Sequence, residues 1–201
     1  DYAKYFDFDL TNTSKAPKSV KLFSFVEFCL WDAADDQNNY QRNLSIGEVE
    51  VDGSTIYHKT EYRERRDHYA VHSVNAKVAG FDTDRESFLG PWNGFAEPQV
   101  VAEGKSRSSV ASGWSPIGSH QLAVDLAPGE EKTFVFVLGY VENPVGEKWE
   151  SPGVVNKNPA RELLARFQTT AQADTALVAL REYWTEMLSK YTVRSGDERL
   201  D

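Results

Sequence analysis

Two long apolar segments constrain the fold of this chain more than any other feature of its sequence. Residues 20–31 read VKLFSFVEFCLW and residues 133–141 read TFVFVLGYV. Successive side chains of an extended strand point to opposite faces, and both faces of these two segments are largely apolar. A strand of this kind must be covered on both sides. The pattern therefore predicts two central strands inside a layered, strand-rich domain.

A hairpin is predicted over residues 46–60. The dipeptide Asp52-Gly53 is typical of a type I′ turn, whose two central residues need positive φ angles. A two-residue turn there pairs Val51 with Ser54. The next apolar segment, residues 68–78, is expected to add a further strand.

A second hairpin is predicted over residues 120–141. Alternating apolar residues precede Pro128 and Gly129, which favour a turn, and the second long apolar segment follows. Residues 90–98 contain two glycines and two prolines and are expected to be irregular. Residues 32–43 are polar, without an apolar period, and are interpreted as a loop.

The period of the apolar residues changes near the C-terminus. Asn158 can cap a helix that has Pro159 at its first position. A longer helix is expected at about residues 172–191, where apolar residues recur every three or four positions. The sequence thus predicts a mainly β fold, with a β-sandwich domain over residues 1–155 and a helical linker over residues 156–201.

Composition excludes several classes of protein. The 22 basic residues are outnumbered by 31 acidic ones among 201, so a non-specific nucleic-acid binder is not expected. No segment approaches the roughly 20 apolar residues of a membrane-spanning helix. The single cysteine, Cys29, cannot form an internal disulfide. We therefore expect a cytoplasmic protein with neither nucleic acid nor a membrane as its partner.

Five segments carry a resemblance to a known family. In chain order they are FVEFCLWDAADDQNNYQRNLS (25–45), YHKTEYRERRDHYA (57–70), GFDTDRESFLG (80–90), GKSRSSVASGWSPIGSHQL (104–122) and LGYVENPVGEKWESPGV (138–154). Together they resemble the amino-terminal β-sandwich region of the cellobiose phosphorylases of glycoside hydrolase family 94. The resemblance extends from about residue 8 to residue 201.

The resemblance implies a fold and an activity. The fold is a two-sheet antiparallel super-sandwich, similar to galactose mutarotase, with C-terminal linker helices. Its opening strands are expected upstream of this chain, and an (α/α)6 barrel downstream. The activity is inverting phosphorolysis of a β-1,4-glucoside, a disaccharide or oligosaccharide, with inorganic phosphate as co-substrate and no other cofactor. One carboxylic acid then suffices as the catalyst, and the barrel carries it.

The resemblance also implies a substrate-binding loop. Family members are homodimers in which the sandwich of one subunit lends a loop to the active site of the other. The matching positions here are Gln41 and Arg42, with Asn43 beside them. Arginine and glutamine suit sugar hydroxyls, because they offer several donors and an acceptor. The chain alone is expected to be non-catalytic.

Two alternatives from other classes remain open. The chain is a β-glucan hydrolase if carboxylates among Asp82, Asp84 and Glu86 act as a pair. Side chains two positions apart on a strand lie about 7 Å apart, within the range of about 6.5–9.5 Å for inverting glycosidases. We prefer to interpret the segment that contains these three carboxylates as a polar loop.

The chain is a carbohydrate-binding module if Trp92 and Trp114, in Gly- and Pro-rich segments, stack on sugar rings.

No metal site is predicted. An acidic cluster lacks the glycine and the distal glutamate of a calcium loop, so a turn is the preferred interpretation: Asp32, Asp35, Asp36 and Asn38. Two histidines on the strand expected at residues 68–78 point to one face, but no third ligand is identifiable. All four histidines are therefore interpreted as partly buried structural residues: His58, His68, His72 and His120. The mixed-charge run at residues 61–67 is interpreted as a solvated segment rather than a phosphate site.

Overall fold

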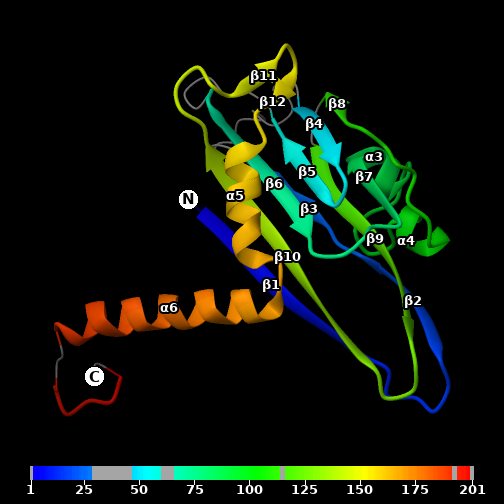
Figure 1. Cartoon of the computed structure of the whole chain (residues 1–201). Coiled ribbons are helices and arrows are strands. Elements are labelled where there is room, and N and C mark those ends of the chain that lie inside the picture. The colour runs from blue at the N-terminus through cyan, green and yellow to red at the C-terminus, as the bar shows by residue number, and fades with distance from the viewer. Residues whose placement is uncertain (1, 29–46, 60–65, 114–115, 192–193, 200–201) are drawn as a thin grey trace.

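The structure is a computed structural model that describes residues 2–28, 47–59, 66–113, 116–191 and 194–199. Its strands are β1 (Tyr2–Thr11), β2 (Lys18–Phe23), β3 (Val26–Glu27), β4 (Gly47–Asp52), β5 (Thr55–His58), β6 (His68–Val74), β7 (Gly80–Asp84), β8 (Ser112–Gly113), β9 (Pro116–Leu126), β10 (Glu131–Glu142), β11 (Trp149–Ser151) and β12 (Val154–Val155). Its helices are α3 (Arg85–Leu89), α4 (Gln99–Glu103), α5 (Asn158–Leu164), η1 (Ala165–Phe167) and α6 (Thr170–Ser189). Figure 1 shows their arrangement.

The larger of the two main sheets confirms one of the two central strands. Its order is β1-β10-β6-β5-β4-β8, and its pairs are antiparallel. Strand β10, which contains residues 133–141, lies between β1 and β6. Its valines pack on one face of the sheet and its aromatic residues on the other. Strand β1 pairs along its whole length with β10.

The smaller sheet corrects the prediction for residues 20–31. Strands β2 and β3 pair with β9 in one continuous register, from Lys18 with Leu126 to Glu27 with Ile117. Strand β7 pairs with the other side of β9, so β9 is central, and within the described residues the segment of β2 and β3 pairs with β9 alone. The segment is apolar on both faces because another layer lies against each face, not because strands flank it on both sides. Residues 29–31 lie outside the described residues.

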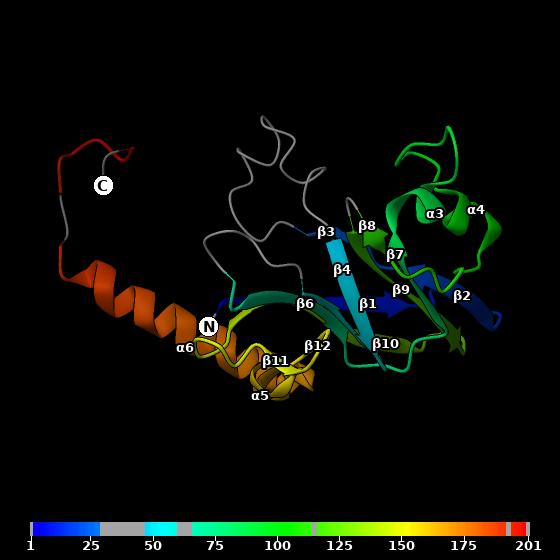
Figure 2. The same ribbon diagram turned by 90° about the horizontal axis from the view of Figure 1, so that it is seen from above.

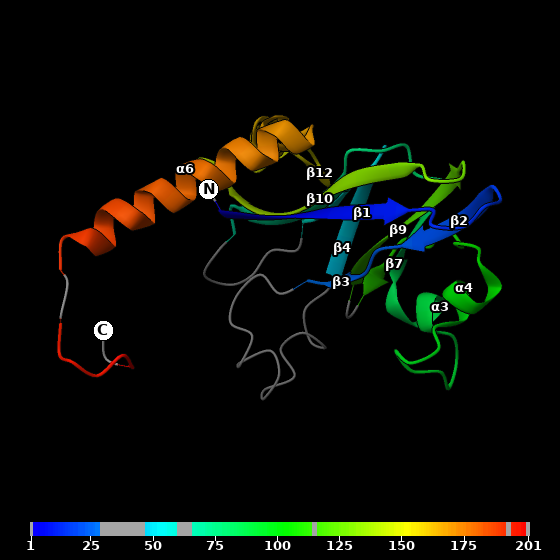
Figure 3. The same ribbon diagram turned by 90° about the horizontal axis from the view of Figure 1, so that it is seen from below.

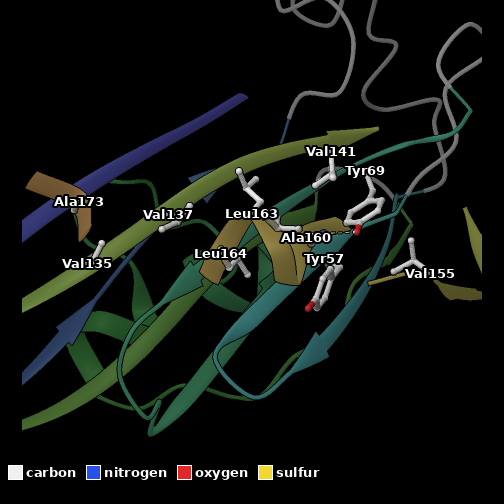
Figure 4. Close-up of a cluster of buried hydrophobic side chains, with 11 residues drawn as sticks. Tyr57, Tyr69, Val135, Val137, Val141, Val155, Ala160, Leu163, Leu164 and Ala173 are labelled. Atoms are coloured by element: carbon white, nitrogen blue, oxygen red, sulfur yellow. Dashed lines mark hydrogen bonds between the residues drawn. The ribbon is translucent and has the colours of Figure 1, made fainter. Parts of the chain in front are cut away.

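The molecule is built in layers (Figures 2 and 3). Helix α5 covers the outer face of the larger sheet, where a cluster of aliphatic and tyrosine side chains packs beneath it (Figure 4). Between the sheets lie two further apolar clusters, around Leu122 and around Phe28. Helices α3 and α4 cover the outer face of the smaller sheet through Phe88, Leu89 and Val100. This mainly β, two-sheet antiparallel architecture is the predicted fold class.

The first predicted hairpin forms, but with a different register. Val51 pairs with Ile56 and Asp52 with Thr55, so the two turn residues are Gly53 and Ser54. Gly53 has a φ of 60°. Asp52 was predicted in the turn, because a type I′ turn requires positive φ at both central positions. The observed turn has positive φ at the glycine alone, as in a type II′ turn, so Asp52 remains in the strand.

The second predicted turn is correct, but the pairing is wrong. The Glu130 amide donates to the Ala127 carbonyl at 3.0 Å, and Gly129 has a φ of 76°. The turn joins β9 of the smaller sheet to β10 of the larger sheet, so these strands do not pair. The Asn12 side chain bridges this crossing by donating to the carbonyls of Leu126 and Ala127 at 3.1 and 3.0 Å.

Both C-terminal helices are present. Helix α5 begins at Asn158 with Pro159 in its first turn, although its cap is Lys157 rather than the predicted Asn158. Helix α6 starts with a capping box between Thr169 and Gln172 and then extends away from both sheets (Figures 1 and 3). From Val178 onward it exposes large apolar residues, among them Val178, Leu180, Tyr183, Trp184, Met187 and Leu188. Within the described part of the chain, every helix is too short or too polar to cross a lipid bilayer.

Candidate functional site

The candidate substrate loop connects β3 to β4. Its predicted residues Gln41, Arg42 and Asn43 lie outside the described residues. The two ends of the connection are fixed. Phe28, 4% exposed, packs between the sheets. A Cβ atom on Gly47 would lie 2.5 Å from Cδ of Pro116, so only glycine fits there. We call the surrounding end of the sandwich the loop end, defined by Phe28, Gly47, the C-terminal ends of β5 and β10, the N-terminal end of β6, and β11.

A hydrogen-bonded cluster of three side chains lies at the loop end. His68 bonds through Nδ1 to the Tyr140 hydroxyl, and its Nε2 lies 3.1 Å from Oε1 of Glu142. His68 and Glu142 are direct cross-strand partners on β6 and β10. The two contacts fix the orientation of the imidazole. Because the Glu142 side chain is 71% exposed, the cluster also presents a carboxylate to solvent.

A second polar cluster fastens the outer layers to the larger sheet. Oε1 of Glu50 lies 3.2 Å from Nζ of Lys59 and accepts from the Val155 amide at 2.8 Å, and its Oε2 pairs with Nζ of Lys157. Burial alone would raise the pKa of Glu50, yet the hydrogen bonds from Lys157, Val155 and Lys59 lower it below its ordinary value. Glu50 thus joins β4 to β12 and to the start of α5.

Trp149 packs beside two lysines of the same end. Nζ of Lys148 lies 5.2 Å from the Trp149 ring centroid and Nζ of Lys59 lies 6.0 Å from it, distances at which a cation is attracted to an indole face. Lys148 is only 1% exposed. Burial, and then the charge of Lys148, lower the pKa of His58 to about 3. The neutral His58 ring stacks on Phe28 with centroids 5.0 Å apart.

A pair of histidines lies deeper between the sheets. The rings of His72 and His120 have centroids 4.7 Å apart, and the Ser24 hydroxyl lies 3.1 Å from Nε2 of His72 and 3.3 Å from Nδ1 of His120. Burial lowers the pKa of His72 to about 4. Burial, with a further contribution from His72, lowers the pKa of His120 to about 3. Both rings are therefore neutral at pH 7.

The described residues give the histidines no metal-binding arrangement. His68 and His72 share the inner face of β6, as predicted, but in the described ranges no three histidine, cysteine or carboxylate side chains converge on one point. Residues 29–46, which include Asp32, Asp35, Asp36 and Asn38, lie outside those ranges.

Two of the three carboxylates proposed for a hydrolase, Asp82 and Asp84, have structural partners. Asp82 is fully buried, and its carboxylate accepts hydrogen bonds from the amides of Arg107 and Ser109 and from the Ser109 hydroxyl. Asp84 caps α3 by accepting from the Ser87 amide at 2.7 Å. Glu86 is exposed in the first turn of the same helix. The strand register shifts between Asp82 and Asp84, so the two do not alternate regularly along β7. These contacts favour the interpretation of this segment as structural.

The two candidate tryptophans have different outcomes. Trp114 lies outside the described residues. Trp92 lies in the irregular connection between α3 and α4, where its side chain is 100% exposed and its φ is 70°. A bulky residue with positive φ is uncommon, because its Cβ is crowded by the backbone.

Sequence reasoning missed the clusters at the loop end. Glu50 and Tyr140 lie in the two predicted hairpins, whereas Glu142 and Lys148 lie beyond them, where no element was predicted. His68 and Glu142 are separated by 73 residues and meet only because β6 pairs with β10. The only available signal was the run of polar residues at the ends of otherwise apolar strands.

The two-sheet architecture agrees with a match to a known family. Residues 1–170 match the family described as "Glycosyl hydrolase 94, supersandwich domain". The match covers most of the chain, so the chain belongs to this family.

Particular relatives are similar over nearly the whole chain. The N,N′-diacetylchitobiose phosphorylase of Vibrio furnissii is 27% identical over 201 residues, which cover 99% of this chain and 23% of the relative. The enzyme of the same name from Vibrio proteolyticus shows the same identity and coverage. The solabiose phosphorylase of Paenibacillus borealis is 27% identical over 168 residues, which are 80% of this chain and 22% of the relative. The chain thus spans less than a quarter of the length of these relatives.

Proposed function

We propose that this chain is the sandwich part of a longer enzyme that cleaves a β-linked disaccharide or oligosaccharide by inverting phosphorolysis. The observation that carries the proposal is the match of residues 1–170 to the supersandwich domain. Relatives named as disaccharide phosphorylases align with 80–99% of the chain, which supports the same reaction class. Inorganic phosphate is the attacking group in this reaction. A cytoplasmic location belongs to the same proposal, because the sugar phosphate product is charged and is retained there.

The role proposed for the chain is to complete a sugar site. Gln41 and Arg42, with Asn43, would hydrogen-bond sugar hydroxyls in the active site of a partner subunit within a homodimer. The fixed stems at Phe28 and Gly47 support this role, since a binding loop is most precise when a rigid scaffold holds its ends.

The general acid is proposed to lie outside these 201 residues. The structural contacts of Asp82 and Asp84 support this view, because neither carboxylate is left to protonate a leaving group. The exposed apolar residues of α6 support a role for residues 156–201 as a linker that packs against further polypeptide. The chain alone therefore binds without turnover.

The substrate is proposed to be a β-1,4-linked disaccharide, with cellobiose or a cellodextrin as the first candidate. N,N′-diacetylchitobiose and solabiose are the comparison substrates, because relatives are named for them. A panel of the three sugars will rank them.

The test uses two proteins: the purified 201-residue chain, and the longest polypeptide of the source gene that contains it. Each is incubated with inorganic phosphate and, in separate reactions, with each of the three disaccharides of the panel, and the release of sugar 1-phosphate is measured. Phosphate-dependent release by the longer polypeptide alone is expected. An Arg42→Ala variant of it should lower kcat/KM, whereas Lys15→Ala, a surface change on a distant turn, should not. Sugar 1-phosphate from the 201-residue chain, or none from either protein, would refute the proposal.

A further inference from the structure

The connection between α3 and α4 contains a tryptophan in a backbone conformation that suits glycine. The Asn93 amide donates to the Gly90 carbonyl at 3.3 Å, so residues 90–93 form a turn with Pro91 in the second position. Trp92, in the third position, has a φ of 70°. Proline followed by a positive φ is typical of a type II turn, in which glycine or asparagine is strongly preferred third. Tryptophan is among the residues least suited to that position.

The Trp92 side chain contributes nothing to the packing of the described fold. It is 100% exposed. Other residues fix the connection. A Cβ atom on Gly90 would lie 2.3 Å from Oε1 of Gln99, which marks a close approach of the two ends. The Phe95 ring lies 5.3 Å from the Phe25 ring and 5.2 Å from the Arg85 guanidinium. A well-anchored loop therefore holds a strained, unpacked indole, a combination that indicates a function.

We infer that Trp92 is a stacking platform for a pyranose ring, an inference that rests on the proposed function because its ligand is the class of substrate proposed there. A pyranose has a face of C–H groups that packs on a flat aromatic ring, and a rim of hydroxyls. Asn93 and Glu97, both exposed in the same connection, supply amide and carboxylate groups for such hydroxyls.

The surroundings of Trp92 favour a sugar over a protein partner. A stable protein interface buries about 800 Å² on each partner around an apolar centre. Phe95 of the same connection is also 53% exposed, although its ring contacts Phe25 and Arg85. The remaining residues of 91–97 are polar, small or proline. One fully exposed ring and one half-exposed ring among polar neighbours form a small apolar area, which matches a sugar unit better than a protein interface. The connection extends beyond α3 and α4, away from both sheets, where a saccharide chain can reach it (Figures 2 and 3).

The test separates binding from stability through the choice of substitution. Trp92→Gly places the preferred residue in the turn, so the variant should unfold at the same or a higher temperature than the parent. Trp92→Phe keeps an aromatic face. Tyr191→Ala, the control, removes a side chain that is 83% exposed beyond the end of α6. The 201-residue chain and each variant are titrated with cellobiose and with N,N′-diacetylchitobiose, and the indole N–H signals are followed by NMR.

One indole signal, absent from Trp92→Gly, should shift on addition of sugar in the parent. The Trp92→Gly variant should bind at least about tenfold more weakly, a loss on the scale of one good contact. Trp92→Phe and Tyr191→Ala should bind within about threefold of the parent. Three results would each overturn the inference. The first is equal affinity of Trp92→Gly and the parent for sugar, and the second is no shift of the Trp92 signal with either sugar. The third is concentration-dependent self-association of the parent that is lost in Trp92→Gly. Phosphorolysis by the longer polypeptide is measured separately. If the longer polypeptide turns over substrate but Trp92 does not bind sugar, only the inference is refuted. If Trp92 binds sugar but the longer polypeptide shows no turnover, only the proposed function is refuted.

Discussion

The buried histidine pair predicts a steep loss of stability in mild acid. His72 and His120 are neutral in the folded protein, with pKa values of about 4 and about 3, whereas the ordinary value is 6.5. As pH falls below 6.5 the unfolded chain binds protons that the folded protein cannot bind. Stability is therefore full above about pH 7 and is lost progressively as pH falls towards 4.

The size of the effect follows from the two pKa values of each residue. For one histidine with a pKa of 6.5 unfolded and about 4 folded, linkage gives a loss of about 2 kcal/mol between pH 8 and pH 5. His120 contributes about the same at pH 5, since its folded pKa lies lower still. The pair thus removes about 4 kcal/mol, a large part of the roughly 5–15 kcal/mol of a typical domain. His58, which is also buried, adds to this loss.

The assay is urea unfolding of the 201-residue chain at pH 8, 6 and 5, followed by tryptophan fluorescence. The substitution His72→Gln removes one titrating group and keeps a polar side chain beside Ser24. We expect this variant to be less stable than the parent at pH 8. Its loss between pH 8 and pH 5 should be smaller than that of the parent by about 2 kcal/mol. His120→Gln should behave alike. A parent whose unfolding free energy changes by less than about 1 kcal/mol over this range, or variants with the same pH dependence as the parent, would refute the reasoning.

Three substitutions test the remaining clusters by chemical denaturation at pH 7.5. Glu50→Gln leaves two buried lysines without their carboxylate and should lower the free energy of unfolding by about 3 kcal/mol. The control Glu48→Gln removes a 52% exposed partner of Lys59 and should lower it by less than about 1 kcal/mol. Equal losses would contradict the role given to Glu50. Asp82→Asn replaces an acceptor of several amide hydrogen bonds and should cost about 2–3 kcal/mol, and an unchanged midpoint would show that the carboxylate is not structural. Tyr69→Phe removes a hydroxyl that donates to the Asn156 carbonyl before α5 and accepts from the Ala160 amide within α5. The free energy of unfolding should fall by about 1–2 kcal/mol. No fall would mean that α5 is held by apolar contacts alone.

The fold class could be predicted because it depends on local patterns. The apolar period of residues 133–141 and the turn at Pro128 and Gly129 both appear as predicted. The errors concern partners rather than elements. An apolar face does not reveal whether a strand or a helix covers it, so residues 20–31 were placed at the centre of a sheet. A turn does not reveal whether its two strands pair, so β9 and β10 were assigned to one hairpin.

The candidate site could be predicted only in part. Gln41 and Arg42 were chosen through the family resemblance and lie outside the described residues, so they remain predictions. Trp92 was selected for its Gly- and Pro-rich surroundings, and its full exposure is consistent with that choice. The partners of Asp82 could not be predicted, because the amides of Arg107 and Ser109 reach it only through the path of the chain after α4.

The pairing of β1 with β10 affects how this protein emerges from the ribosome. Thr11 pairs with Glu131 and Tyr2 with Tyr140, so the first strand waits for more than a hundred later residues. At about 5–20 residues per second, that delay is on the order of ten seconds. During this time Phe6 and Phe8, which remain 55% and 40% exposed even after folding, cannot pair with β10. Strand β1 is thus a segment on which a chaperone has a long opportunity to act.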